Sequence, residues 1–170
     1  ILMNGMVRNQ KLPNAILTPT TKDERDRLIS EKEILDQEIM TLYEWEKCRE
    51  YAEKLFKFGE EMSDKNGLIL VDTKYEFGVD ENGNILLVDE LHTPDSSRYW
   101  LKHSFEYRFN NKLEPESIDK DIVRKWVNNT YRNPYDLDLN IIIPDDIQLS
   151  LASSYLQLYE IITQERLFIL

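Results

Sequence analysis

The spacing of apolar residues first predicts helix. Between residues 30 and 65 apolar side chains recur at intervals of three, four and seven, with charged residues between them. Ser30 and Glu33 match a capping box, in which the serine side chain accepts a backbone N–H and the glutamate reaches back. Asn66 and Gly67 then provide a left-handed stop. We therefore expect one long helix, or two abutting helices, over residues 30–65.

The pattern changes after residue 67 to one that is typical of strands. Residues 68–71 are continuously apolar, and the alternation that follows to residue 78 predicts a strand with one polar face. Residues 85–91 form a second such run. Asn82-Gly83 between them is a strong hairpin signal. A two-residue type I′ turn there places residues whose numbers sum to 165 opposite each other.

The remaining chain predicts two further helices and two irregular segments. Residues 118–128 and 144–163 have apolar positions at helical spacing. Residues 131–143 indicate a loop, with a short strand at 141–143. Residues 1–29 have no sustained period and form a connecting segment, which leaves 30–170 as the folded lobe. The predicted fold class is α+β, an antiparallel sheet packed with helices.

Composition excludes several classes of protein. The chain has 170 residues, of which 41% are hydrophobic, and a net charge of −11, so it suits one compact domain that repels nucleic acid. Its single cysteine, Cys48, cannot form an internal disulfide, which favours a reducing, cytoplasmic setting. No apolar run approaches the roughly 20 residues of a membrane span. The apolar C-terminal end and the absence of an initial methionine suggest a fragment of a longer polypeptide.

The predicted hairpin places two carboxylates in conflict. Its register sets Glu76 opposite Asp89, with Cβ atoms about 4.5–5.5 Å apart, where like charges destabilise the pair. A divalent cation resolves this conflict, and Mg²⁺ suits one or two carboxylates with nucleotide phosphates. Lys74 shares the face of Glu76, about 6.6 Å along the strand, and would hold a phosphate. The alternative is a solvated hairpin face on which Lys74 is a counterion.

A second group of residues suits an anionic ligand. Arg98 follows Ser96 and Ser97, and a guanidinium next to hydroxyl donors is suited to phosphate or carboxylate. Lys120 and Arg124 lie at i and i+4 of a predicted helix, where like charges repel unless an anion bridges them. The alternative is that the neighbouring Asp121 neutralises the second of these cations without any ligand.

Two long motifs make the chain resemble a known family. They read LVDTKYEFG at residues 70–78 and VDELHTPDSSRYW at residues 88–100. Together with KLP and TPTTK upstream and DKD and VRKW downstream, they closely resemble the signatures of SAICAR synthetase, phosphoribosylaminoimidazole-succinocarboxamide synthase. The resemblance covers nearly the whole chain. It implies the second lobe of a two-lobed, ATP-grasp or kinase-like fold, whose N-terminal lobe is absent from this chain.

The resemblance also implies a reaction and a division of residues. ATP phosphorylates the carboxylate of CAIR, and the amino group of L-aspartate displaces phosphate to give SAICAR, ADP and phosphate. ATP and Mg²⁺ are assigned to Lys74, Glu76 and Asp89, with the two carboxylates as metal ligands. CAIR or its phosphate is assigned to Asp95, Ser97, Arg98, Lys120 and Arg124. The expected catalytic residues are Lys74 and Asp95.

Two other functions remain open on the sequence. The missing lobe is compatible with an inactive ATP-binding or scaffolding fragment, and the ATP half of the site is compatible with a kinase-like phosphotransferase that uses another acceptor. Expected partners are the two small-molecule substrates and the remainder of the polypeptide. Assembly into a homo-oligomer is left open, and neither nucleic acid nor a membrane is expected.

Overall fold

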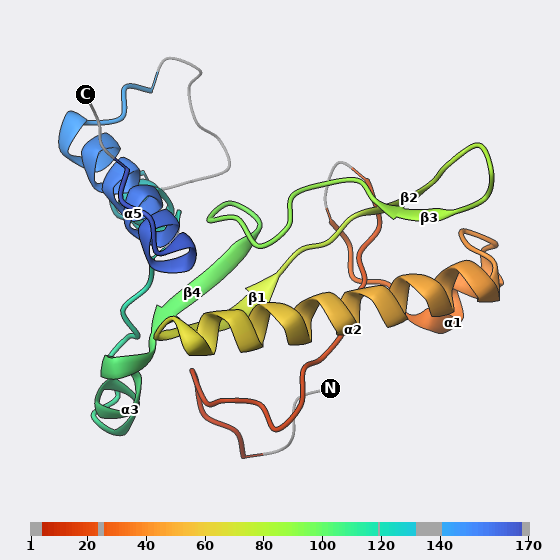
Figure 1. Cartoon of the computed structure of the whole chain (residues 1–170), viewed down its shortest axis with the longest axis horizontal. Coiled ribbons are helices and arrows are strands. Elements are labelled where there is room, and N and C mark those ends of the chain that lie inside the picture. The colour runs from red at the N-terminus through yellow and green to blue at the C-terminus, as the bar shows by residue number, and fades with distance from the viewer. Residues whose placement is uncertain (1–4, 24–25, 119, 132–140, 168–170) are drawn as a thin grey trace. The chain divides into compact units, whose positions relative to one another are not determined.

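The computed structural model describes residues 5–23, 26–118, 120–131 and 141–167, and they form a mixture of helices and antiparallel strands. Two compact units divide the chain: residues 1–58 with 75–89, and residues 59–74 with 90–170. In chain order the elements are α1 (Glu31–Asp36), α2 (Leu42–Lys65), β1 (Leu68–Thr73), β2 (Phe77–Val79), β3 (Ile85–Leu87), β4 (Ser97–Leu101), α3 (Lys102–Asn110), α4 (Asp121–Thr130) and α5 (Asp145–Thr163) (Figure 1).

The predicted capping box is present, and a second one explains why the first helical region is split. Ser30 Oγ accepts the backbone N–H of Glu33, whose carboxylate accepts the N–H of Ser30 at 2.9 Å. Five residues after α1 ends, Glu44 accepts the N–H of Thr41 at 2.7 Å while Thr41 Oγ1 accepts the N–H of Glu44. Each cap satisfies free N–H groups at a helix start. The alternative of two helices is therefore the correct one.

The hairpin in the first unit has a register one residue away from the prediction. Phe77 pairs with Leu87, so paired numbers sum to 164 and not to 165. The N–H of Val88 donates to the carbonyl of Glu76 at 3.0 Å, which places Val88 opposite Glu76. The prediction that Asp89 lies directly opposite Glu76 is therefore wrong.

The cause of this shift is the side chain of Asp80. Its Oδ1 accepts the backbone N–H groups of Asn82 and Asn84 at 2.9 and 2.8 Å, and its Oδ2 accepts the Asn84 side-chain amide. The carbonyl of Asp80 also accepts the N–H of Gly83, whose φ is +82°. These bonds favour a three-residue loop with glycine in the left-handed region over a two-residue type I′ turn. The hydrogen bonds from Asn84 and Asn82 lower the pKa of Asp80.

The second unit contains an antiparallel pair of strands, of which the sequence predicted only the first. β1 pairs with β4, with Leu68 opposite Leu101 and a bulge between Leu70 and Asp72. β1 ends at Thr73, and β4 lies where the sequence analysis predicted no strand. Leu68, Leu70 and Tyr99 are almost fully buried in this pair. The two strands form the scaffold for the site described below (Figure 1).

The helices of the second unit agree with the pattern in two cases of three. α4 and α5 lie within a few residues of their predicted bounds, whereas α3 was not predicted. No residue of α3 is buried, and a helix without a buried face has no clear apolar period to predict it. Its Phe105 stacks on Trp100, with ring centroids 5.5 Å apart. Residues 141–143 are not a strand. No helix among the described residues is long and apolar enough to cross a membrane.

Candidate functional site

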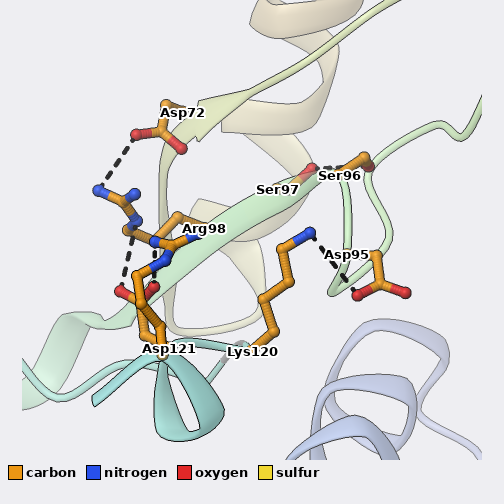
Figure 2. A pocket seen from close by; sticks show the side chains of 8 residues that line it. Asp72, Asp95, Ser96, Ser97, Arg98, Lys120 and Asp121 are labelled. Atoms are coloured by element: carbon orange, nitrogen blue, oxygen red, sulfur yellow. Dashed lines mark hydrogen bonds and ion pairs between the residues drawn. The ribbon is translucent and has the colours of Figure 1, made fainter. Parts of the chain in front are cut away.

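A cavity of about 130 Å³ lies in the second unit, beside the start of β4 and the start of α4 (Figure 2). All five residues assigned to the substrate line it, together with one serine and two acidic residues that were not assigned. The full set is Asp72, Asp95, Ser96, Ser97, Arg98, Lys120, Asp121 and Arg124. Segments that are far apart in the sequence therefore meet at one place.

A tight turn before β4 places the polar end of the cavity. Thr93 and Ser96 exchange hydrogen bonds between their backbone N–H groups and hydroxyls at 3.1 and 3.2 Å. The N–H of Ser97 donates to the carbonyl of Thr93, and the hydroxyl of Ser97 donates to Thr73 Oγ1 at 2.9 Å. Ser97 is buried, with 6% of its surface exposed. These bonds fix the backbone from which Asp95 and Arg98 project.

The cations of the cavity are paired with carboxylates inside it. Arg98 lies between Asp72 at 3.4 Å and Asp121 at 3.7 Å. Asp121 also pairs with Arg124 at 2.6 Å, and Figure 2 shows this carboxylate beside the guanidinium of Arg98. Lys120 Nζ lies 3.8 Å from Asp95 Oδ1. The carboxylates offset the mutual repulsion of the cations, so repulsion by itself no longer requires a ligand.

These pairs define what the cavity can bind. An incoming phosphate competes with carboxylates for the guanidinium groups, and it gains bidentate, charge-assisted hydrogen bonds when it succeeds. Asp72 was missed as a pocket residue. Asp121 was named only as the alternative counterion of Arg124, and the structure shows that pair. Asp72 has no comparable local signal, because its pairing with Arg98 depends on the β1–β4 register.

A tyrosine from the C-terminal helix also reaches this site. Tyr155 lies on α5, among the apolar positions at helical spacing that predicted the helix. Its hydroxyl donates to Asp95 Oδ1 at 2.6 Å. Sequence spacing gave no indication of this contact, because the two residues are 60 positions apart.

The residues assigned to ATP and Mg²⁺ do not line this cavity. Lys74 follows β1 in the same unit, and its backbone N–H donates to the carbonyl of Ser96 at 2.9 Å. Glu76 and Asp89 belong to the other unit, where Lys22 forms an ion pair with Glu76. Among the described residues no group of three or more His, Cys, Asp or Glu side chains is placed to hold a metal. A site of two carboxylates completed by nucleotide phosphates does not require such a group.

His92, which precedes the turn, has a packing role. It is half-buried at a φ of +55°, and its carbonyl accepts the hydroxyl of Tyr99 at 2.7 Å. A Cβ atom at Gly59 of α2 would lie 2.5 Å from Cε1 of the imidazole, so only glycine allows this approach. Burial lowers the pKa of His92 because it disfavours the charged imidazolium.

Comparison with known proteins identifies the family. A family model described as SAICAR synthetase matches residues 1–139. The chain belongs to the SAICAR synthetase family. It is 48% identical over 163 residues to the phosphoribosylaminoimidazole-succinocarboxamide synthase of Legionella pneumophila (strain Paris), covering 95% of this chain and 52% of that protein. It is 49% identical over 170 residues to the chloroplastic synthase of Arabidopsis thaliana, covering 99% of this chain and 41% of that protein.

Solved SAICAR synthetases share the fold. The SAICAR synthase from Saccharomyces cerevisiae, complexed with SAICAR, has a TM-score of 0.74 and 31% identity, covering 98% of this chain and 52% of that one. A type-2 SAICAR synthetase in complex with ADP has a TM-score of 0.68 and 28% identity, covering 94% and 55%. The α+β assignment is therefore confirmed. The chain spans about half the length of the SAICAR synthetases it matches.

Proposed function

We propose that this chain provides the substrate-binding part of an ATP-dependent ligase that joins L-aspartate to CAIR. ATP phosphorylates the carboxylate of CAIR, and the aspartate amine then displaces phosphate to form the amide of SAICAR, with ADP and phosphate as the other products. The acyl phosphate converts a poor leaving group into a good one, which is the reason for the use of ATP.

The observation that carries this proposal is the convergence of Asp95, Ser97, Arg98, Lys120 and Arg124 on one cavity. The resemblance to the family assigns these residues to the substrate, and they come from two motifs that are separated in the sequence. The cavity offers an arginine pair and a lysine within a chain of net charge −11. Guanidinium and ammonium donors of this kind are what the phosphate of a phosphoribosyl substrate requires, although three carboxylates of the lining pair with them. Family membership and a SAICAR-bound relative support the same assignment.

The proposal assigns the phosphates of ATP to Lys74 and Mg²⁺ to Glu76 and Asp89. Carboxylate oxygens suit this hard cation, which leaves its other positions to water and nucleotide. Bound Mg²⁺ would neutralise charge on the transferring phosphoryl group. The observed register does not set the two carboxylates directly opposite each other, so this assignment does not rest on the hairpin. It is supported by the chemistry of the donor atoms, by the resemblance and by a relative in complex with ADP. Glu76 forms an ion pair with Lys22.

The setting completes the proposal. Small-molecule substrates are the expected ligands, since the acidic chain disfavours nucleic acid. Cys48 is a buried free thiol, which fits a reducing compartment, and we assign the cytoplasm.

The test is aspartate-dependent release of ADP by the native protein that carries this chain, with CAIR, ATP and Mg²⁺ present. The ligase predicts ADP release only when both CAIR and aspartate are added, with SAICAR formed in equal amount. ADP release that needs another acceptor would identify a phosphotransferase. Binding of ATP without turnover would identify an inactive fragment, and either result would overturn the proposal.

A further inference from the structure

The hydrogen bond from Tyr155 to Asp95 has a consequence beyond packing. Tyr155 is half-buried on α5, and its hydroxyl donates to Oδ1 of Asp95 at 2.6 Å. Such a short bond to an ionised acceptor is stronger than a neutral one. The hydroxyl of Tyr155 therefore contacts a residue that lines the cavity, although Tyr155 itself does not line it.

The two oxygens of Asp95 have different surroundings. Oδ1 accepts the Tyr155 hydroxyl and faces Lys120 Nζ at 3.8 Å. Among the residues that the structure describes, no hydrogen bond or ion pair reaches Oδ2. Figure 2 shows one oxygen directed at Lys120 and the other directed away from it. The terminal torsion of an aspartate is broad and roughly two-fold, so a side chain held at one oxygen has a defined orientation that an unheld one lacks.

We propose that Tyr155 is a positioning residue for substrate recognition, acting through Asp95. Its hydroxyl fixes Oδ1, so that Oδ2 is oriented to accept a hydrogen bond from an amino or hydroxyl group of the phosphoribosyl substrate. This inference rests on the proposed function. It assigns to the C-terminal helix a part in the site that neither the motifs nor the apolar pattern indicates. Orientation before binding lowers the entropy lost when the substrate binds.

The alternative is that the bond only anchors α5. An anchoring role predicts a loss of stability from Tyr155→Phe that Asp95→Ala also causes, with no change in kcat/KM for CAIR. A positioning role predicts a loss of recognition that disappears when Asp95 is removed, because the hydroxyl then has nothing to orient.

The experiment measures kcat/KM for CAIR at subsaturating concentration, with KM for ATP, in the native protein and in Tyr155→Phe. Tyr159→Phe is the matched control, since it makes the same change one turn further along α5, where the hydroxyl donates to Glu165 at 3.4 Å. Both changes are repeated in an Asp95→Ala background. We expect Tyr155→Phe to lower kcat/KM for CAIR about tenfold or more, the loss of one charge-assisted hydrogen bond. KM for ATP should not change.

In the Asp95→Ala background the same substitution should change kcat/KM less than about twofold, and Tyr159→Phe should have no effect in either background. An equal loss in both backgrounds, or an unchanged kcat/KM in Tyr155→Phe, would overturn the inference. If the native protein shows no aspartate-dependent ADP release, the proposed ligase function fails instead. Calorimetric titration of CAIR then makes the same four-way comparison without turnover, and an absence of coupling there also overturns the inference.

Discussion

Replacement of Arg98 by alanine is the most informative single change in the pocket. Its guanidinium lies between Asp72 at 3.4 Å and Asp121 at 3.7 Å, with 37% of the side chain exposed. The substitution removes a donor for the substrate phosphate and also leaves both carboxylates without this cation. The lining therefore changes from equal numbers of cations and carboxylates to an excess of carboxylates, which disfavours an anion.

The expected size follows from these contacts. A hydrogen bond to a charged group contributes roughly 1.5–3 kcal/mol, and repulsion from the two carboxylates places Arg98 in the upper part of that range. A loss of about 2–3 kcal/mol corresponds to roughly 30- to 150-fold weaker binding of CAIR. Arg124 is more exposed, at 55%, and faces one carboxylate, so Arg124→Ala should weaken binding about five- to tenfold.

The assay is calorimetric titration of CAIR and, separately, of ATP with Mg²⁺. Arg108→Ala is the control, because this arginine lies on α3 in the same unit, pairs with Glu116 and does not line the cavity. Arg98→Ala should weaken CAIR binding and leave ATP binding within about twofold. Equal losses for CAIR and ATP, or an equal loss of CAIR binding in Arg108→Ala, would refute the division of the site.

Three further predictions concern single residues. Lys74→Met should lower turnover sharply while the hydrogen bond from the backbone N–H of residue 74 to Ser96 is kept; steady-state kinetics and thermal unfolding check this. Gly59→Ala should destabilise the fold by about 1–3 kcal/mol in urea unfolding, because the new Cβ overlaps the ring of His92 and lies 2.8 Å from the side chain of Leu70. This overlap outweighs the better helix propensity of alanine. Burial lowers the pKa of His92 in the folded protein. The stability that neutral His92 contributes is therefore present above its unfolded pKa near 6.5 and is lost as pH falls through its lower folded pKa. A His92→Gln variant should lose this acid sensitivity in unfolding titrations.

Local signals predicted the local structure. The Ser30 capping box is where the sequence placed it, and the second cap at Thr41 has the same signature and was readable in the same way. The hairpin failed in register because the Asp80 side chain selects a longer loop, a choice that depends on three hydrogen bonds rather than on the Asn82-Gly83 pair alone. A one-residue slip exchanges the faces of a strand, so a small local error removed the geometric argument for opposed carboxylates.

Long-range pairing limited the rest of the prediction. The motif around Arg98 was predicted to bind an anionic ligand. The strand that presents it, β4, pairs with β1 across the intervening residues 74–96, and no local pattern encodes that partner. The acidic partners of the pocket and the hydroxyl of Tyr155 arise from the same kind of tertiary contact. Site residues were therefore easier to predict from the sequence than the contacts that orient them.

The central claim is that the cations of this pocket bind the phosphate of the substrate. The most direct measurement compares the affinity of CAIR with that of its riboside, which lacks the phosphate, in the native protein and in Arg98→Ala. The account predicts that the phosphate contributes at least about a hundredfold in the native protein and that this advantage shrinks at least about tenfold in the variant. An advantage that is unchanged in Arg98→Ala would contradict it.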